Sequence, residues 1–320
     1  MTTQSLGVGS EGGRGQPVLH RRWLTQARQE AIESYIWISP WLIGFVVFMA
    51  GPIIASLVLS FTKWDIVRPA RWVGLQNYQL ILGTDPDFRQ ALKVTLTYAA
   101  VTLPLHLILG LGLSLLLNLK IKGMNVYRTL FYLPAILPGV AVTLLWVWIF
   151  NPDFGIINWL LSLVGIKGPT WFSSPTWALP GLMIMSLWGV GGGAVIYLAG
   201  LQNIPPHLYE AAEIDGAGTW RKFWNITIPL LTPTLFFQLV MGLIGSFQAF
   251  VSAYIATDGG PLKATLFYML YLYRTAFTSF KMGYGSALAW ILTIIILACT
   301  LLVFKSSTLW VYYESERKGR

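Results

Sequence analysis

Long apolar stretches separated by short polar segments run along most of the chain. Six of them reach the roughly 20 residues that an α-helix needs to cross the hydrocarbon core of a bilayer. They cover residues 35–61, 91–117, 130–150, 177–201, 233–257 and 286–305. An isolated span must be helical, because only a helix pairs all of its own backbone groups inside lipid. The pattern therefore predicts an all-α integral membrane protein with six transmembrane helices.

The charged residues set the expected topology. The chain carries a net charge of +9, but its basic residues lie at the ends of the apolar stretches and do not form the patch that nucleic acid needs. With the N-terminus inside, 13 of the 22 Lys and Arg residues fall on the cytoplasmic side. We therefore expect both termini to be cytoplasmic. Residues 1–34 form an N-terminal tail, 35–310 the transmembrane domain and 311–320 a C-terminal tail.

The predicted spans lack the side chains of several functional classes. They contain no Asp, Glu, Lys or Arg except the boundary residues Lys93 and Lys305, so a proton- or sodium-coupled carrier is disfavoured. No H-E-x-x-H zinc motif or nucleophile–base pair is present, and Cys299 is the only cysteine, which leaves no catalytic residue, disulfide or metal site. His106 is expected to be a hydrogen-bonded packing residue. Without a G-x-x-x-x-G-K-[ST] sequence, any energy from ATP must come from another protein.

The loop at residues 204–233, between the fourth and fifth predicted spans, has strong local signals. Pro205 or Pro206 suits the first position of a helix, and Gly216 suits its left-handed stop. Thr219 is expected to cap a second short helix. Ile228 precedes a proline and is expected to be extended, and Pro233 is expected to start the fifth span. These signals predict a compact helix–turn–helix, to which an ordinary structured loop is the alternative.

The same loop carries a recognisable motif. It resembles the EAA motif of binding-protein-dependent ABC importer permeases, E-A-A-x3-G-x9-I-x-L-P, and differs from it only at Ile228, where the family has Leu. The matching residues, with the Asp that commonly accompanies them, are Glu210, Ala211, Ala212, Asp215, Gly216, Ile226 and Pro229. Further segments at 36–42, 61–65, 72–78 and 127–134 are similar to carbohydrate-uptake permeases of the maltose-transporter type, and to the first of their two permeases.

This resemblance implies a fold, partners and a location. It implies the type I ABC importer permease fold, with six transmembrane helices and a cytoplasmic coupling helix formed by the EAA residues. The implied partners are a second homologous permease, a dimeric ATPase that binds ATP and Mg²⁺, an extracytoplasmic solute-binding protein and membrane lipid. It also implies a multi-pass protein of the bacterial or archaeal inner membrane, with no cofactor bound by this chain itself.

The translocation path is expected among aromatic and amide side chains of the last three spans. Sugar sites use such groups in dry cavities. The candidates are Trp188, Tyr197, Gln248, Ser252, Tyr254 and Trp290, with Trp188, Gln248, Tyr254 and Trp290 preferred. Gln248 leads, because a mid-span amide is costly unless it faces a polar cavity or another helix. Each residue has a packing role as its alternative. The expected solute is a neutral sugar, and the alternatives are glycerol-phosphate compounds or a self-contained secondary carrier.

Overall fold

The structure is a computed structural model that describes residues 26–312, and it divides the chain into two compact units at residue 55. The described part of the first unit is helical: α1 (Gln26–Phe45), the π-helix η1 (Val46–Ala50) and the start of α2 (Gly51–Ser60). Because α1 begins at Gln26, residues 26–34 of the expected N-terminal tail are helical. The rest of the predicted N-terminal tail lies outside the described residues.

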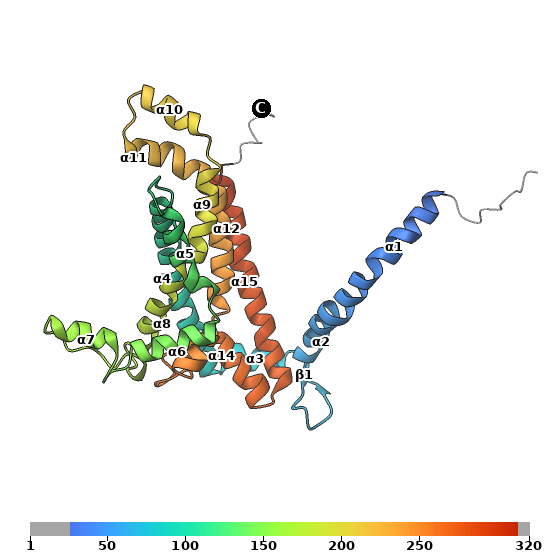
Figure 1. Cartoon of the computed structure of the whole chain (residues 1–320). Helices are drawn as coiled ribbons and strands as arrows, with labels where there is room; N and C mark the ends of the chain where they lie inside the picture. The colour runs from blue at the N-terminus through green and yellow to red at the C-terminus, as the bar shows by residue number, and fades with distance from the viewer. Residues whose placement is uncertain (1–25, 313–320) are drawn as a thin grey trace, which may run out of the picture. The chain divides into compact units, whose positions relative to one another are not determined.

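Long helices build the second unit (Figure 1). They are α4 (Pro86–Leu117), α8 (Ala178–Leu187), α9 (Gly191–Gln202), α12 (Ile228–Phe247) and α15 (Met282–Trp310), with a 3₁₀ turn η3 (Trp188–Val190) joining α8 to α9. One end of this bundle carries α10 (Pro206–Ile214) and α11 (Thr219–Lys222), and we call it the loop end. The other end, which we call the far end, carries α3 (Gln76–Gly83), α13 (Val251–Ala256) and α14 (Tyr268–Tyr273).

Short elements complete the fold. They are α5 (Met124–Ile136), α6 (Gly139–Ile149), α7 (Ile156–Leu163), the 3₁₀ turn η2 (Trp171–Ser173), and the π-helices η4 (Phe223–Thr227) and η5 (Arg274–Thr278). Strands β1 (Thr62–Lys63) and β2 (Arg71–Trp72) pair antiparallel, with Thr62 opposite Trp72.

The helices confirm a membrane-spanning fold and correct one span. Among the described residues, five helices are long and apolar enough to cross a bilayer: residues 30–60, 86–117, 178–202, 219–256 and 282–310. The third expected span, 130–150, is instead two helices, α5 and α6, bent by 99°. Leu137 has extended geometry (φ −67°, ψ 142°) because it precedes Pro138, and a residue before proline avoids the α region. The sixth span exists only if α5 and α6 count as one.

Two π-helical turns lie just before prolines inside spans, at η1 before Pro52 and at η4 before Pro229. The N–H of Ile228 donates to the oxygen of Phe223, five residues back, which is the π pattern. The wider turn accommodates the ring of Pro229, so Ile228 stays helical (φ −62°, ψ −50°). The expectation of an extended Ile228 is therefore wrong.

The fifth span also begins earlier than expected, and Pro233 lies inside α12. Proline lacks the N–H that would bond to the oxygen of Pro229, four residues back. The Thr232 hydroxyl donates to that oxygen instead, at 2.6 Å. A threonine next to a proline thus keeps the backbone satisfied, as membrane helices require.

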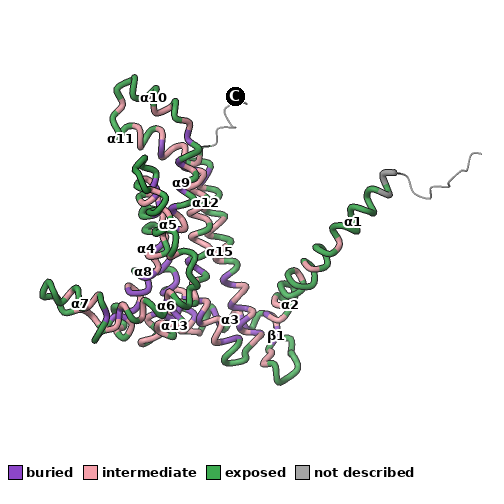
Figure 2. Tube along the Cα trace, in the orientation of Figure 1, coloured by how far each residue is buried: buried purple, intermediate pink, exposed green. Residues whose placement is uncertain are grey.

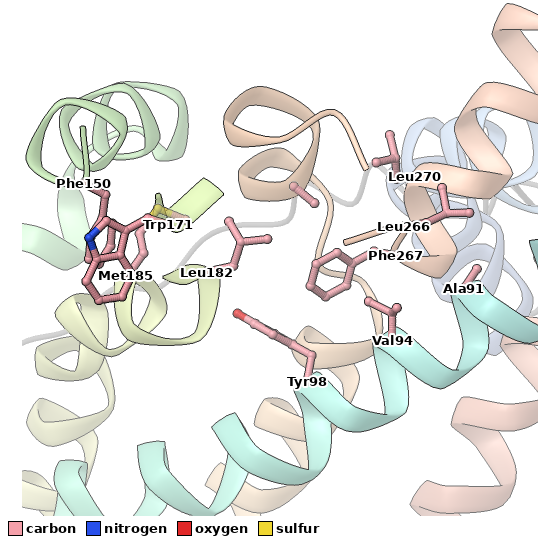
Figure 3. Packing of buried hydrophobic residues seen from close by; sticks show 11 residues of the cluster. Ala91, Val94, Tyr98, Phe150, Trp171, Leu182, Met185, Leu266, Phe267 and Leu270 are labelled. Carbon is pink, nitrogen blue, oxygen red and sulfur yellow. The ribbon is translucent and has the colours of Figure 1, made fainter. Parts of the chain in front are cut away.

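A cluster of buried side chains near the far end joins α4 to α8 and α14 (Figure 3). Tyr98 of α4 meets Phe267 edge to face, with ring centroids 4.9 Å apart. Elsewhere much of the helical surface is exposed within this single chain (Figure 2). Even in the most enclosed span, residues 178–202, only 39% of its most apolar window is buried. Lipid or other subunits must therefore cover these apolar faces.

A carboxylate at the far end holds three helices together. Asp85 caps α4 by accepting from the backbone N–H groups of Asp87 and Phe88, at 2.9 and 3.1 Å. Its other oxygen accepts from the Tyr271 hydroxyl and, at 2.6 Å, from the Tyr284 hydroxyl. Burial alone would raise the pKa of Asp85, but these hydrogen bonds together lower the pKa below its ordinary value of 3.8.

Candidate functional site

The loop-end helix α10 is closed at both ends by backbone geometry. Pro205 is extended (φ −61°, ψ 127°) and Pro206 takes the first helical turn, where a missing N–H costs nothing. After Ile214, the N–H of Ala217 donates to the oxygen of Ala212 at 2.8 Å, and that of Gly216 to the oxygen of Glu213 at 3.0 Å. This double closure is a Schellman motif.

The turn depends on glycine for its conformation. Gly216 has φ +74°, in the left-handed region, as the sequence predicted. No atom lies within 4 Å of the position that a Cβ would occupy there. A side chain at residue 216 would therefore meet backbone strain but no steric clash.

One side of α10 is anchored to the bundle. Leu208 and Tyr209 pack with Ile226 against a small core of Leu201, Ile204 and Leu231. The Tyr209 hydroxyl lies 3.0 Å from Oγ1 of Thr227. An exposed ion pair joins Lys222 to Glu213 at 2.6 Å. These contacts fix α10 relative to the start of the fifth span.

The other side of α10 faces away from the protein. Glu210, Ala211 and Asp215 are exposed, and Ile214 is 87% exposed. Within the described residues the Glu210 carboxylate has no hydrogen bond or ion pair. A hollow of about 300 Å³ lies between α10 and α11, with Asp215, Arg221 and Lys222 among its lining residues. The exposed side of α10 thus carries the acidic Glu210 and Asp215 and the apolar Ile214. Such a surface on a rigid helix is suited to binding another protein.

The second helix of the loop begins differently from the prediction. Gly218 is its N-cap residue (φ −70°, ψ 170°), and no side chain caps it. Thr219 is the first helical residue, so its predicted capping role is wrong. The chain then continues through η4 into α12, which makes residues 219–256 one long helical span.

A membrane cavity of about 310 Å³ lies between α4, the α8–α9 segment and α12. Its polar lining comes from Tyr98, Thr102, His106, Ser186, Tyr197, Gln238 and Ser246. Glycines at residues 189, 193, 242 and 245 also line the cavity, and a Cβ at Gly193 or Gly242 would collide with Gln238 or Leu103. The lining contains no Asp, Glu, Lys or Arg, so the cavity is mainly apolar and its polar groups are hydroxyl, amide and imidazole side chains.

The polar groups that line this cavity differ in whether they have hydrogen-bond partners among the described residues. The Gln238 amide donates to the oxygen of Gly193 at 2.9 Å and so ties α12 to α9. The two ring nitrogens of His106 lie 2.8 Å and 3.1 Å from the oxygens of Thr102 and Ser186, which confirms a hydrogen-bonded packing role. The Tyr197 hydroxyl is buried and has no hydrogen-bond partner in the described residues. Among the residues that line the cavity, it is the only fully buried side-chain polar atom without a partner in the described residues.

The four preferred path residues are not brought together and do not line this cavity. Trp188 packs edge to face on Trp146, with ring centroids 6.0 Å apart. Tyr254 stacks on Phe250, and Trp290 donates to Oγ of Ser56 at 3.2 Å. Gln248, expected to face a polar cavity or a helix, is exposed after the end of α12.

Of the wider candidate set, Tyr197 lines the cavity, whereas Gln238 was missed. The signal used for Gln248, an amide inside an apolar span, applies equally to Gln238. It was overlooked because the fifth span was expected to begin at Pro233, which placed Gln238 near its end. With the helix starting at Thr219, Gln238 lies well inside it.

Comparison with known proteins identifies the class. The family model described as the inner membrane component of binding-protein-dependent transport systems matches residues 106–310. The chain therefore belongs to this family of ABC transporter permeases.

Individual relatives agree with this assignment over nearly the whole chain. The probable ABC transporter permease protein YesP of Bacillus subtilis is 46% identical over 91% of this chain and 95% of its own. The trehalose/maltose transport system permease protein MalF of Thermococcus litoralis is 33% identical over 87% of this chain and 94% of its own.

The fold is likewise that of a chain in a solved ABC transporter. A chain of a bacterial alginate ABC transporter, crystallised with a periplasmic protein that carries an alginate pentasaccharide, matches with a TM-score of 0.78. It is 23% identical, and the match covers 90% of this chain and 97% of that chain. At this identity the likeness establishes the fold alone.

Proposed function

We propose that this chain is one of two permease subunits of an ATP-driven importer for neutral sugars, and that α10 couples it to a separate ATPase. Membership of the permease family supports the transport role. Relatives named for trehalose and maltose or for arabinooligosaccharides support the solute class. The partners proposed are a homologous permease, a dimeric ATPase that binds ATP and Mg²⁺, and an extracytoplasmic binding protein.

The observation that best supports coupling is that α10 is a rigid helix with one face packed on the bundle and one face exposed. The anchored face holds α10 on the start of the fifth span. The free face presents Glu210 and Ile214, both exposed, and within residues 26–312 the Glu210 carboxylate has no hydrogen bond or ion pair. We assign Glu210, Ala211, Ala212, Asp215 and Gly216 to the contact and its turn, and Ile226 and Pro229 to the junction with α12. In this assignment the protein spans the inner membrane, and the loop end and both termini lie on its cytoplasmic side.

The cavity supports a neutral solute over a phosphate ester. Phosphate sites use Arg, Lys or a helix N-terminus to meet the negative charge. The cavity lining has no Arg or Lys, whereas hydroxyl, amide and aromatic groups suit sugar hydroxyls and ring faces. We place the substrate path beside Tyr197 and Gln238, and the glycerol-phosphate alternative is therefore disfavoured.

Uptake by the complete transporter in proteoliposomes tests the coupling assignment. Glu210→Lys reverses the charge on the free face, and Glu213→Gln is the matched control, since Glu213 only pairs with Lys222 at the surface. We expect Glu210→Lys to abolish ATP-driven uptake while the subunit stays in the membrane, and Glu213→Gln to keep it. Normal uptake by Glu210→Lys would overturn the assignment.

Two further measurements address the alternatives. Uptake that persists in vesicles without ATP would point to a self-contained carrier. The solute itself is best found by measuring thermal stabilisation of the associated binding protein against a panel of sugars and glycerol phosphates. Stabilisation by a phosphate ester alone would contradict the neutral-sugar assignment.

A further inference from the structure

The short helix α7 stands apart from the bundle and has no role in the proposed transport path. It follows α6 after a turn at residues 151–155 and extends sideways from the bundle (Figure 1). Its side chains form three distinct faces, and two of them are explained by contacts within the chain.

The first face holds α7 on the bundle. Ile157 and Leu161, one turn apart, pack against the buried cluster near the far end. That cluster includes Ala91, Val94 and Tyr98 from the first four turns of α4. The membrane spans α4 and α8 also contribute side chains to this cluster from their first turns, so α7 is attached at the end of the bundle where these two spans begin.

The second face is polar and binds the neighbouring loop. The Asn158 amide donates to the oxygens of Pro152 and Pro169, at 3.1 and 3.2 Å. Its oxygen accepts from Nε1 of Trp171 at 2.7 Å. Ser162, four residues on, continues this face and is exposed. The segment 152–171 is thereby fastened around α7, which fixes how α7 is turned.

The third face is apolar and uncovered. It consists of Ile156, Trp159, Leu160 and Leu163, at the i, i+3, i+4 and i+7 spacing of one helix face, and their exposed fractions lie between 48% and 64%. Its surroundings include the exposed Lys167 and Asp153, which line a hollow of about 830 Å³ together with Trp159. An apolar stripe containing Trp and bordered by charged groups is the composition of a helix that lies in the membrane interface.

Lipid explains the apolar stripe of α7 better than a protein partner does. Four half-exposed side chains cannot supply the roughly 800 Å² that each partner gives to a standard protein interface. The preceding helix α6, part of the bent and apolar α5–α6 pair, exposes Leu144, Leu145 and Trp148, so exposed apolar surface continues from α6 to α7. We infer that α7 lies along the bilayer surface at the far end, with this stripe inserted among lipid acyl chains.

Site-directed spin labelling tests this inference in the assembled transporter. Cys299 is the only cysteine, so Cys299→Ser gives a cysteine-free background. Single cysteines at Leu160 and Leu163 probe the stripe, and one at Ser162 probes the polar face. Leu302 of α15, 67% exposed, serves as the lipid control, and Val67, 90% exposed in the β1–β2 loop, as the water control.

The readout is collision of each label with oxygen, which concentrates in lipid, and with a nickel chelate, which stays in water. We expect labels at residues 160 and 163 to favour oxygen as at residue 302, and the label at 162 to favour the chelate. Stripe labels that match residue 67 would overturn the inference. Stripe labels shielded from both reagents would show that a protein covers α7, and would overturn it equally.

The unmodified chain provides a second measurement if labelled variants assemble poorly. An apolar diazirine dissolved in the liposomes labels lipid-facing residues on illumination. We expect adducts on the peptide that contains residues 156–163 as well as on α15. Adducts on α15 with none on the α7 peptide would overturn the inference.

Discussion

The α10–α11 loop and the membrane cavity are specified in opposite ways. In the loop, residues close in sequence make the decisive bonds, such as the closure of Ala217 onto Ala212 and of Gly216 onto Glu213. In the cavity, the decisive contacts join helices far apart along the chain: Gln238 meets Gly193, and His106 lies within hydrogen-bond distance of Ser186. Local rules therefore describe the loop, whereas the cavity depends on helix packing that no local pattern determines.

After the loss of uptake expected for Glu210→Lys, the largest effect is expected at Gly216, where it tests the local rule. Gly216→Val forces a β-branched residue into the left-handed region, which costs at least about 1–2 kcal/mol. We expect sugar uptake by the assembled transporter to fall about tenfold or more. Gly216→Asn is the matched control, because Asn tolerates this region and nothing crowds the site. Equal uptake by the two variants would show that the turn geometry does not matter.

The two mid-span amides test the long-range rule. Gln238→Leu removes the amide that lines the cavity and bonds to Gly193, a loss of about 1 kcal/mol, so we expect uptake at low sugar concentration to fall about fivefold to tenfold. Gln248→Leu changes an exposed amide outside the cavity and should alter uptake less than about twofold. A larger loss of uptake in Gln248→Leu than in Gln238→Leu would instead place Gln248 on the substrate path.

A substitution at Tyr197 separates the role of this side chain in helix packing from its proposed role in binding the sugar. Tyr197→Phe removes a buried hydroxyl without a partner, so the protein should keep or gain stability, by up to about 1 kcal/mol. We expect uptake to fall about threefold, because a sugar hydroxyl loses this partner. Thermal unfolding of the purified transporter and uptake, measured on the same preparation, separate the two effects. Unchanged uptake would remove Tyr197 from the proposed path.

The smallest expected effect lies at Asp85, where a local cap and long-range bonds share one carboxylate. Since the pKa of Asp85 is lowered, its contribution is full above the ordinary value of 3.8 and is lost as the pH falls through the folded-state pKa. Asp85→Asn should lower stability at neutral pH by about 1 kcal/mol, a value reduced by partial solvent exposure. The difference from wild type should shrink in acid. A constant difference at every pH would contradict the role of the charge.

Prediction from the sequence succeeded for local features such as those of the loop and failed for features that depend on helix packing, such as the cavity. The apolar lengths located the spans, and Pro206 and Gly216 located the ends of α10, because length and turn chemistry are local properties. Proline misled the prediction where its effect depends on its partners. A π turn kept Ile228 helical, and the Thr232 hydroxyl kept Pro233 inside a helix. Because the prediction starts the fifth span at Pro233, it places Gln238 near the end of that span and misses it as a mid-span amide. Which side chains face one cavity is set by helix packing, and no single span encodes it.

The junction between α11 and α12 has a mechanical consequence. The two helices run in different directions, and the chain turns between them at η4, just before Pro229 (Figure 1). Motion of the loop therefore acts on the start of α12, and Gln238 lies about 15 Å along α12 from Ile228, at 1.5 Å per residue. A tilt of about 10° there would displace the helix beside the cavity by roughly 2.6 Å, about the reach of one hydrogen bond. Small rotations at the loop end are thus amplified into the difference between making and breaking a contact such as that of Gln238 with Gly193.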